Sequence, residues 1–189
     1  MIHKFDRELR HDGYYMGLAE QVKTGANCLG SKIGAVIVLD NRVLSTGYNG
    51  TPDGFKKCLE YGCVRCKDSS LEKEGKIDEM SDPTHIGGAA LDRCVCVHAE
   101  QNAFLAAARF GVSINKATLY TTLSPCFNCL KEAIQVGINR IVFGNLYEWK
   151  LNDELKEQYK NLHEHLSAGD RNNFMKFEGE QKEIVGVTS

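Results

Sequence analysis

Three features that mark other classes of protein are missing from this chain of 189 residues. No early apolar run is long enough for a signal peptide or a membrane-spanning helix, since residues 1–10 are mostly polar or charged. The 23 lysine and arginine residues are scattered and the formal net charge is −2, which argues against a binding track for long nucleic acid. No internal repeat or interdomain linker is evident. We therefore expect one cytoplasmic domain over residues 1–189, with a small-molecule partner and no membrane partner.

Two short motifs carry most of the chemical information in the chain. They are His98-Ala99-Glu100 and Pro125-Cys126-Phe127-Asn128-Cys129, and each opens an apolar segment with helical character. Cys126 and Cys129 are three residues apart, so on a helix they share one face and can hold one metal ion together. His98 can supply a third ligand, which leaves the fourth tetrahedral position to water, as in catalytic zinc sites.

Glu100 distinguishes this pattern from a structural zinc site, which does not need a carboxylate. Its side chain and that of His98 can act on one water only if the ion lies beyond the helix N-terminus, because residues two apart lie on different helix faces. The positive helix ends would then favour thiolates, and zinc lowers the pKa of a bound water toward ~7. Glu100 could take the proton and return it to a ring nitrogen and an amino group that leaves as ammonia. The order H-x-E and then P-C-x-x-C is typical of zinc-dependent nucleobase deaminases.

Further segments carry a more specific resemblance. They are residues 32–37, 45–50, 98–103 and 119–126. Over most of residues 10–145 the chain resembles the deoxycytidylate (dCMP) deaminase family of the cytidine deaminase-like zinc deaminase superfamily. This resemblance implies zinc-dependent deamination of dCMP to dUMP by a homo-oligomer, a hexamer, that dCTP and dTTP regulate, with Mg²⁺ accompanying the triphosphate. Two alternatives stay open: a deaminase of dCTP, free cytidine or a base in RNA, and a zinc-binding module without turnover.

Six of the eight cysteines are not used by the catalytic motif. The remaining cysteines are Cys28, Cys58, Cys63, Cys66, Cys94 and Cys96. In a reducing compartment metal binding is more common than disulfides, and we predict a second, structural zinc among them. The resemblance favours positions 28, 58 and 96. The residues themselves do not select four ligands from six or assign His85 a role, and the alternative is that some are small buried hydrophobic residues.

Residues for substrate and effector are less strongly indicated. Asn49 could bind the sugar or the base, although Asn49-Gly50 is also a turn signal. The N–H of Ala99 could donate to the base carbonyl, because the first amides of a helix lack internal partners, and the Ser124 carbonyl could receive the leaving amino group. The candidate phosphate-binding cations are Lys32, Lys56, Lys57 and Arg109. The resemblance also places Arg109 at a family position linked to an allosteric site. The alternative is that Arg109 is an ordinary surface arginine.

The hydrophobic pattern predicts an α/β fold. We expect helices over residues 6–24, 98–110, 126–136 and 153–166, and strands over 33–39, 42–48, 117–122 and 140–143. The first two strands form a hairpin and are expected to end close to the site. A cysteine-rich insertion covers about 50–96, and the tail from residue 169 is either a last strand or disordered. Together with the family resemblance, the alternation predicts a three-layer α/β/α fold around a mixed sheet of about five strands.

Overall fold

The computed structural model describes residues 4–67, 94–146, 153–167 and 174–178. Parts of the predicted insertion and of the tail, together with His85, therefore lie outside the described residues. In the described part of the chain, no helix has the length and apolar character that a membrane span requires.

All predicted helices and strands are present, with ends that differ by a few residues at most. The helices are α1 (Lys4–Lys23), α3 (Ala99–Arg109), α4 (Phe127–Gln135), α5 (Asp153–Ser167) and the short 3₁₀ helix η1 (Cys58–Glu60). The strands are β1 (Gly34–Leu39), β2 (Arg42–Tyr48), β3 (Thr118–Leu123), β4 (Arg140–Asn145) and β5 (Phe174–Lys176). The last strand confirms one of the two alternatives for the tail.

The five strands form one mixed sheet in the order β2-β1-β3-β4-β5. Strand β1 pairs antiparallel with β2 and with β3, whereas β3, β4 and β5 are parallel neighbours. Parallel neighbours need a crossover, and α4 and α5 provide the two crossovers here. The predicted mixed sheet of five strands is confirmed.

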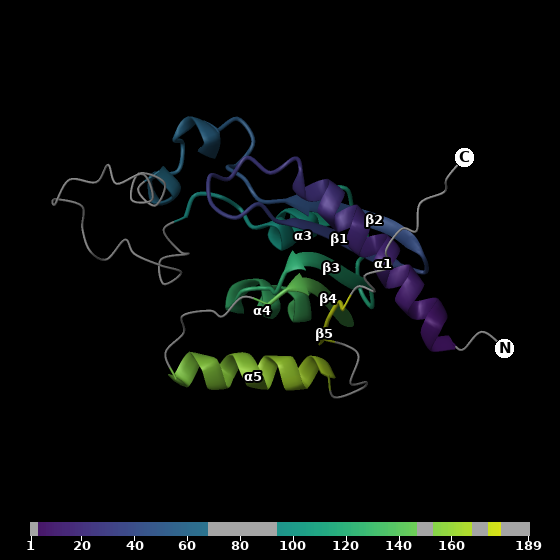
Figure 1. Cartoon of the computed structure of the whole chain (residues 1–189). Coiled ribbons are helices and arrows are strands. Elements are labelled where there is room, and N and C mark those ends of the chain that lie inside the picture. Colours follow the sequence, from purple (N-terminus) through teal and green to yellow (C-terminus); the bar gives the residue numbers. More distant parts are fainter. Residues whose placement is uncertain (1–3, 68–93, 147–152, 168–173, 179–189) are drawn as a thin grey trace, which may run out of the picture.

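The helices cover both faces of the sheet (Figure 1). Successive strand residues point to opposite faces, so each strand contributes to two hydrophobic clusters. In β1, Val36 and Val38 pack with Tyr15 and Ala19 of α1. Neighbouring residues such as Ile37 belong to the other cluster, which includes residues of α3, α4 and α5. This arrangement confirms the three-layer α/β/α architecture.

The β1–β2 hairpin corrects one expectation about the site. Asp40 and Asn41 form its two-residue turn with φ values of 50° and 60°, a left-handed conformation that Asp and Asn tolerate. Because β1 runs antiparallel to β3, its end at Leu39 lies beside the start of β3. Within the hairpin, the end of β2 and the start of β1 lie on the same side of the sheet as the end of β3. The expectation that both strands end close to the site was therefore wrong for β1.

Candidate active site and metal centres

The predicted catalytic ligands lie at the beginnings of two helices. His98 has extended backbone angles (φ −71°, ψ 159°) and directly precedes α3. Cys126 has similar angles (φ −71°, ψ 169°) and precedes α4, at the point where the chain leaves β3. Cys126 is therefore the N-cap of α4 rather than a residue of the helix, and Cys129 lies in the first turn. Both helices direct their positive ends toward these side chains, which favours thiolates.

The ligand atoms have the spacing of a tetrahedral zinc site. The Nδ1 atom of His98 lies 3.5 Å from the Sγ atom of Cys126 and 3.4 Å from that of Cys129. Zinc–nitrogen and zinc–sulfur bonds of about 2.0 and 2.3 Å require a separation of about 3.5 Å between such atoms at the tetrahedral angle. One nitrogen and two sulfur donors are also a ligand set that zinc prefers, so the residues fit the metal.

Hydrogen bonds within the group shift the pKa values of its members. The hydrogen bond between the two thiols lowers the pKa of Cys126 to about 4 and raises that of Cys129. The hydrogen bond with Cys126 raises the pKa of His98. A divalent cation among these atoms would favour two thiolates and a neutral imidazole, because ligation requires those forms.

Glu100 lies beside the ligands, on the second residue of α3, and is 3% exposed. Burial raises the pKa of its carboxyl to about 7. A carboxyl with a pKa near neutrality both accepts and donates a proton readily, which is the property expected of a general acid–base. The arrangement therefore combines candidate ligands for one ion with a buried carboxyl whose pKa lies near neutrality.

Gln101 and Glu132 connect the start of α3 to the middle of α4, and the sequence interpretation missed them. The Gln101 side-chain oxygen accepts a hydrogen bond from the His98 N–H at 3.1 Å, and its amide donates to Glu132 of α4 at 3.0 Å. Gln at the third helical position is part of the capping-box pattern, so this signal was available for Gln101. No local signal identifies Glu132, because its contact joins two helices that are distant in sequence.

The three candidate substrate residues occupy different positions. Asn49 is buried. Its side-chain oxygen accepts a hydrogen bond from the N–H of Ile33, and its side-chain nitrogen donates one to the carbonyl of Ser31, both at 2.8 Å. Ala99 is the buried first residue of α3. Ser124 is also buried, and its N–H donates to the carbonyl of Asn145 at 2.8 Å. Ala99 thus directly follows the candidate ligand His98, and Ser124 lies two residues before the candidate ligand Cys126. Asn49 instead connects the end of β2 to the loop before β1.

The four candidate phosphate-binding cations are all exposed. They are Lys32, Lys56, Lys57 and Arg109. Lys57 borders a surface cavity of about 420 Å³ that Asn27, Tyr48 and Asn102 also line. Arg109 ends α3, about 17 Å along the helix from His98 at 1.5 Å per residue. Its guanidinium lies 6.0 Å from the ring centre of Phe110.

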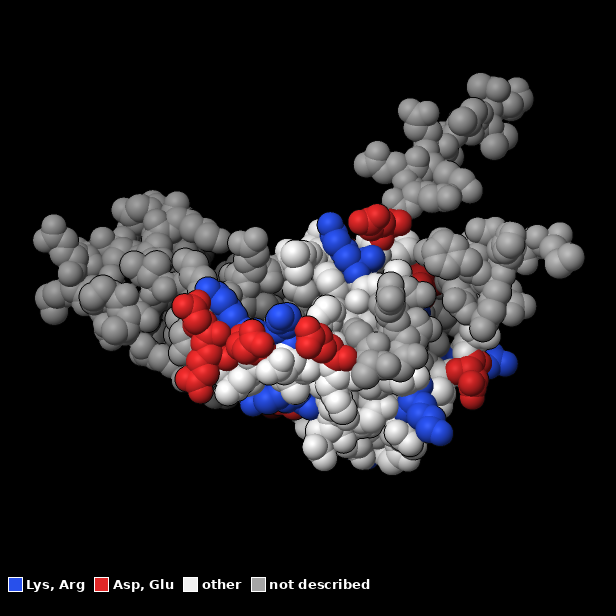
Figure 2. Space-filling model, turned by 90° about the horizontal axis from the view of Figure 1, so that it is seen from below, with Lys and Arg blue, Asp and Glu red and all other residues white. Residues whose placement is uncertain are grey.

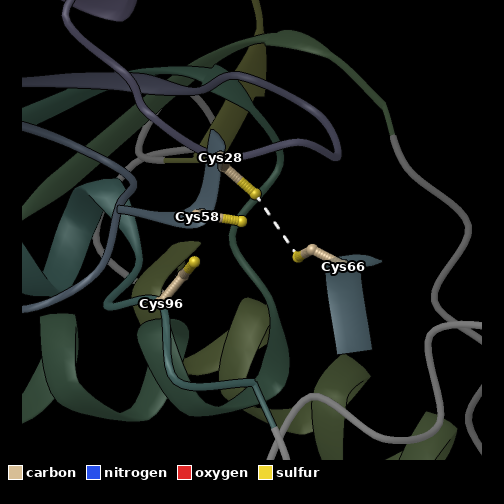
Figure 3. Close-up of side chains that lie close together, drawn as sticks. All are labelled: Cys28, Cys58, Cys66 and Cys96. Atoms are coloured by element: carbon tan, nitrogen blue, oxygen red, sulfur yellow. Dashed lines mark hydrogen bonds between the residues drawn. The ribbon is translucent and has the colours of Figure 1, made fainter. Parts of the chain in front are cut away.

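The other six cysteines lie together, as two overlapping groups of four. One group comprises Cys28, Cys58, Cys66 and Cys96, and the other comprises Cys63, Cys66, Cys94 and Cys96. Within each group the sulfur atoms lie within 4.8 Å of one another. Figure 3 shows the four sulfur atoms of the first group pointing toward a common centre. The fold thus collects every member of the predicted structural pool, and we call these six residues the thiol cluster.

Comparisons with known proteins agree with this geometry. The family model for the cytidine and deoxycytidylate deaminase zinc-binding region matches residues 9–145. Deoxycytidylate deaminase of Schizosaccharomyces pombe is 39% identical over 136 residues, which are 72% of this chain and 37% of that relative. The deoxycytidylate deaminase of Saccharomyces cerevisiae is 36% identical over 150 residues, or 79% of this chain and 42% of that protein. The chain thus spans less than half the length of these two relatives.

A solved structure extends the similarity to most of the chain. The dCMP deaminase of cyanophage S-TIM5, in complex with dCMP and dUMP, is 26% identical with a TM-score of 0.58. The match covers 93% of this chain and 99% of that chain. It confirms the predicted cytidine deaminase-like fold. The chain therefore belongs to the family that carries the cytidine and deoxycytidylate deaminase zinc-binding region.

Proposed function

We propose that this chain is a zinc-dependent deaminase that converts dCMP and water to dUMP and ammonia. The observation that carries the proposal is the meeting of His98, Cys126 and Cys129 at two helix starts, with the buried carboxyl of Glu100 beside them. The named relatives and the neighbour with bound dCMP and dUMP support this choice of substrate.

His98, Cys126 and Cys129 would hold the catalytic zinc. When bound there, zinc supplies the Lewis acidity that makes water a nucleophile near neutral pH. Glu100 accepts one proton from the attacking water and delivers it to the ring nitrogen. It then takes the second proton from the newly added hydroxyl group and delivers it to the amino group, which leaves as ammonia. A carbon–oxygen bond forms at the carbon that bears the amino group, and the carbon–nitrogen bond breaks with release of ammonia. The high pKa of the Glu100 carboxyl suits both proton transfers.

Three backbone or amide groups would position the cytosine ring and sugar. The N–H of Ala99 donates to the base carbonyl, and the carbonyl of Ser124 accepts from the leaving amino group. Asn49 contacts the sugar or the base edge. Its two hydrogen bonds to the backbone use one N–H and one oxygen lone pair, and a carboxamide has two of each. The side chain therefore retains the capacity for a ligand contact while it is held in place.

The distribution of charged side chains argues against a polynucleotide substrate. On the face shown in Figure 2, the described acidic and basic side chains are interspersed, so this face offers no basic track for RNA or DNA. The nearest alternative substrate is dCTP or another cytosine nucleotide or nucleoside. A zinc-binding module without turnover is disfavoured by the buried Glu100, which a purely structural site would not require.

The proposal includes several properties of the whole protein. They are a single domain, a structural zinc in the thiol cluster, a cytoplasmic location, a hexamer, and regulation by dCTP and dTTP with Mg²⁺. A nucleotide effector site would lie near a subunit interface, with Arg109 as its candidate residue. These properties stay predictions from the sequence and from the family resemblance.

Ammonia release by the purified holoprotein tests the proposed reaction. The substrates are dCMP, dCTP, CMP and deoxycytidine, and the variants are Glu100→Gln and the control Glu157→Gln, which changes an exposed carboxylate on α5. We expect release from dCMP, a loss of at least ~10²-fold in Glu100→Gln with its zinc retained, and little change in the control.

Three other outcomes of this experiment would change the assignment. Turnover of dCTP in preference to dCMP would change the assigned substrate but keep the reaction. Activity retained by Glu100→Gln would contradict the role of Glu100. Zinc binding without release from any of the four compounds would contradict the proposed function in favour of a non-catalytic module or a polynucleotide substrate.

A further inference from the structure

The two groups of four sulfur atoms in the thiol cluster share two members. Cys66 and Cys96 belong to both groups. Cys28 and Cys58 belong only to the first group, and Cys63 and Cys94 only to the second. A single tetrahedral ion uses four sulfur ligands, so it would leave two of the six thiols without a role. Two tetrahedra that share one edge have six corners, which is the number of sulfur atoms present.

One sulfur–sulfur distance in each group matches a tetrahedral zinc site, and the other sulfur atoms of each group lie within 4.8 Å of one another. Zinc–sulfur bonds of about 2.3 Å place the sulfur atoms of a tetrahedral site about 3.8 Å apart. In the first group, the sulfur atoms of Cys28 and Cys66 are 3.7 Å apart (Figure 3). In the second group, those of Cys63 and Cys94 are 3.8 Å apart. Each group therefore contains a pair of atoms at the separation that one zinc ion requires.

We propose that the thiol cluster holds two zinc ions, bridged by the sulfur atoms of Cys66 and Cys96. Cys28 and Cys58 complete the first site, and Cys63 and Cys94 complete the second. The resulting arrangement is of the Zn₂Cys₆ type, with two bridging and four terminal thiolates. The inference rests on the structural-zinc part of the proposed function, and it is independent of the deamination reaction.

Charge balance favours two ions over one. One ion with four thiolates carries two net negative charges. Adding a second ion with two further thiolates releases two protons and leaves the net charge of the cluster unchanged. The second ion therefore uses the remaining thiols without increasing the charge that must be buried. Five of the six cysteines are buried, so an unchanged charge matters energetically.

Backbone amides stabilise negative charge on the terminal sulfur atoms. The N–H of Leu29 donates to the sulfur of Cys58 at 3.3 Å, and the backbone N–H of Gly30 donates to the sulfur of Cys28. The Cys63 sulfur also accepts backbone hydrogen bonds, from Cys66 and Val95. These contacts reach both sites of the proposed cluster, since Cys58 and Cys28 belong to one and Cys63 to the other.

The cluster would also hold in place the start of α3, which carries candidate active-site residues. Its ligands come from the loop after α1, from η1, from the helical turn at residues 64–67 and from the segment that leads to α3. Cys96 is two residues from His98, and the intervening Val97 pairs with Gly50 through two backbone hydrogen bonds of 3.2 and 2.8 Å. Two bridged ions would therefore immobilise the start of α3 from outside the catalytic centre.

Native mass spectrometry of the holoprotein tests the number of ions. We expect three zinc ions per chain, two in the cluster and one in the catalytic site. Cys126→Ala should lower the count by one, and so should the double variants Cys28→Ala/Cys58→Ala and Cys63→Ala/Cys94→Ala. A count of three with no ammonia release would overturn the proposed function alone, and a count of two in active enzyme would overturn the binuclear cluster alone.

A second measurement uses the unmodified chain, so it does not depend on how the variants fold. The zinc is exchanged for ¹¹³Cd and the protein is observed by ¹¹³Cd NMR. Two cluster resonances with mutual scalar coupling through the shared sulfur atoms are expected. A single thiolate resonance, or two without coupling, would overturn the bridged arrangement. Disulfides within the cluster, detected as a mass lower by the lost thiol protons, would overturn it as well.

Discussion

At the scale of single residues, Asn49 connects the end of β2 to the loop before β1. The Ile33 N–H and the Ser31 carbonyl both bond its amide, and the side chain is 7% exposed. A turn at Asn49-Gly50 was one of the sequence interpretations, but Gly50 instead forms a β-bridge with Val97. The Asn49 amide thus stabilises the contact between the end of β2 and the loop before β1, whether or not it also binds substrate.

Asn49→Ala should lower the free energy of unfolding by about 1–3 kcal/mol, because it leaves buried backbone groups without partners. Urea denaturation measures the change, and Asn161→Ala, on the exposed side of α5, is the control with little effect. The Michaelis constant for dCMP, measured on the folded variant, reports a substrate contact. Unchanged stability together with a higher Michaelis constant would contradict this stabilising role of Asn49.

At the scale of elements, the position of α3 depends on its close approach to β2. Ser45 donates a hydrogen bond to the carbonyl of Ala103 at 2.7 Å, and Asn102 donates to the carbonyl of Tyr48 at 2.7 Å. Between these contacts, a Cβ atom at Gly47 would collide with the Ala99 carbonyl oxygen and with the backbone of α3. Gly47 therefore allows the helix that carries His98 and Glu100 to lie directly on the strand.

Gly47→Ala should displace the start of α3, because both colliding groups are backbone atoms that cannot rotate away. We expect lower affinity for the catalytic zinc, at least ~10-fold lower turnover and a lower melting temperature, since a small misplacement of catalytic groups is costly. Gly17→Ala in α1 is the matched control, because its Cβ meets nothing within 4 Å. That variant should be stabilised by about 0.5–1 kcal/mol, since Gly is unfavourable inside a helix. Normal turnover in Gly47→Ala would show that α3 adapts.

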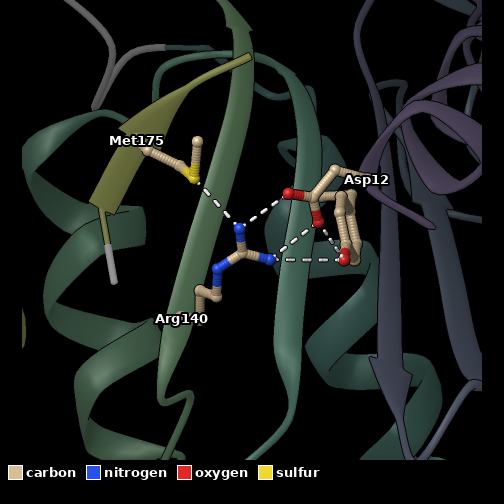
Figure 4. Close-up of polar contacts among 4 residues, drawn as sticks. Asp12, Arg140 and Met175 are labelled. Atoms are coloured by element: carbon tan, nitrogen blue, oxygen red, sulfur yellow. Dashed lines mark hydrogen bonds and ion pairs between the residues drawn. The ribbon is translucent and has the colours of Figure 1, made fainter. Parts of the chain in front are cut away.

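At the scale of the whole molecule, a largely buried ion pair joins α1 to β4 (Figure 4). Two nitrogen atoms of Arg140 on β4 bond the two oxygen atoms of Asp12 on α1, both at 2.7 Å. Tyr120 on β3 donates to Asp12 at 2.7 Å, and burial raises the pKa of this phenol, so it remains a donor. Arg140 also contacts the sulfur of Met175 on β5 at 2.9 Å. The Asp12–Arg140 ion pair thus connects α1 with the strands β3, β4 and β5.

Arg140→Met should lower the free energy of unfolding by about 3–5 kcal/mol, because the Asp12 carboxylate, 3% exposed, loses its charged partner. The double variant Asp12→Leu/Arg140→Met should recover part of this loss. Lys156→Met breaks an exposed pair with Asp153 and is the control with little effect. Chemical denaturation of all three measures the difference. A loss as small as that of the control would mean that Asp12 finds water or another donor.

Much of the fold was predictable because its signals are local. Apolar periodicity located α3, α4 and the strands, and the turn residues Asp40 and Asn41 located the hairpin. The direction of β1 relative to β3 was not predictable from these signals, since it depends on pairing between distant segments. For the same reason, Glu132 was missed and Cys126 was placed inside a helix that it caps.

The sequence by itself determined the types of candidate ligand, the position of the Glu100 carboxyl next to them and the number of cysteines beyond the H-x-E and P-C-x-x-C motifs. Their chemistry follows from residue identity and short spacing, which folding does not change. Only the tertiary structure decided which sulfur atoms are neighbours, because Cys28, Cys58, Cys66 and Cys96 come from separate segments that long-range packing brings together. It also decided the environment of Glu100, since burial and the resulting rise in pKa depend on atoms from several elements rather than on adjacent residues.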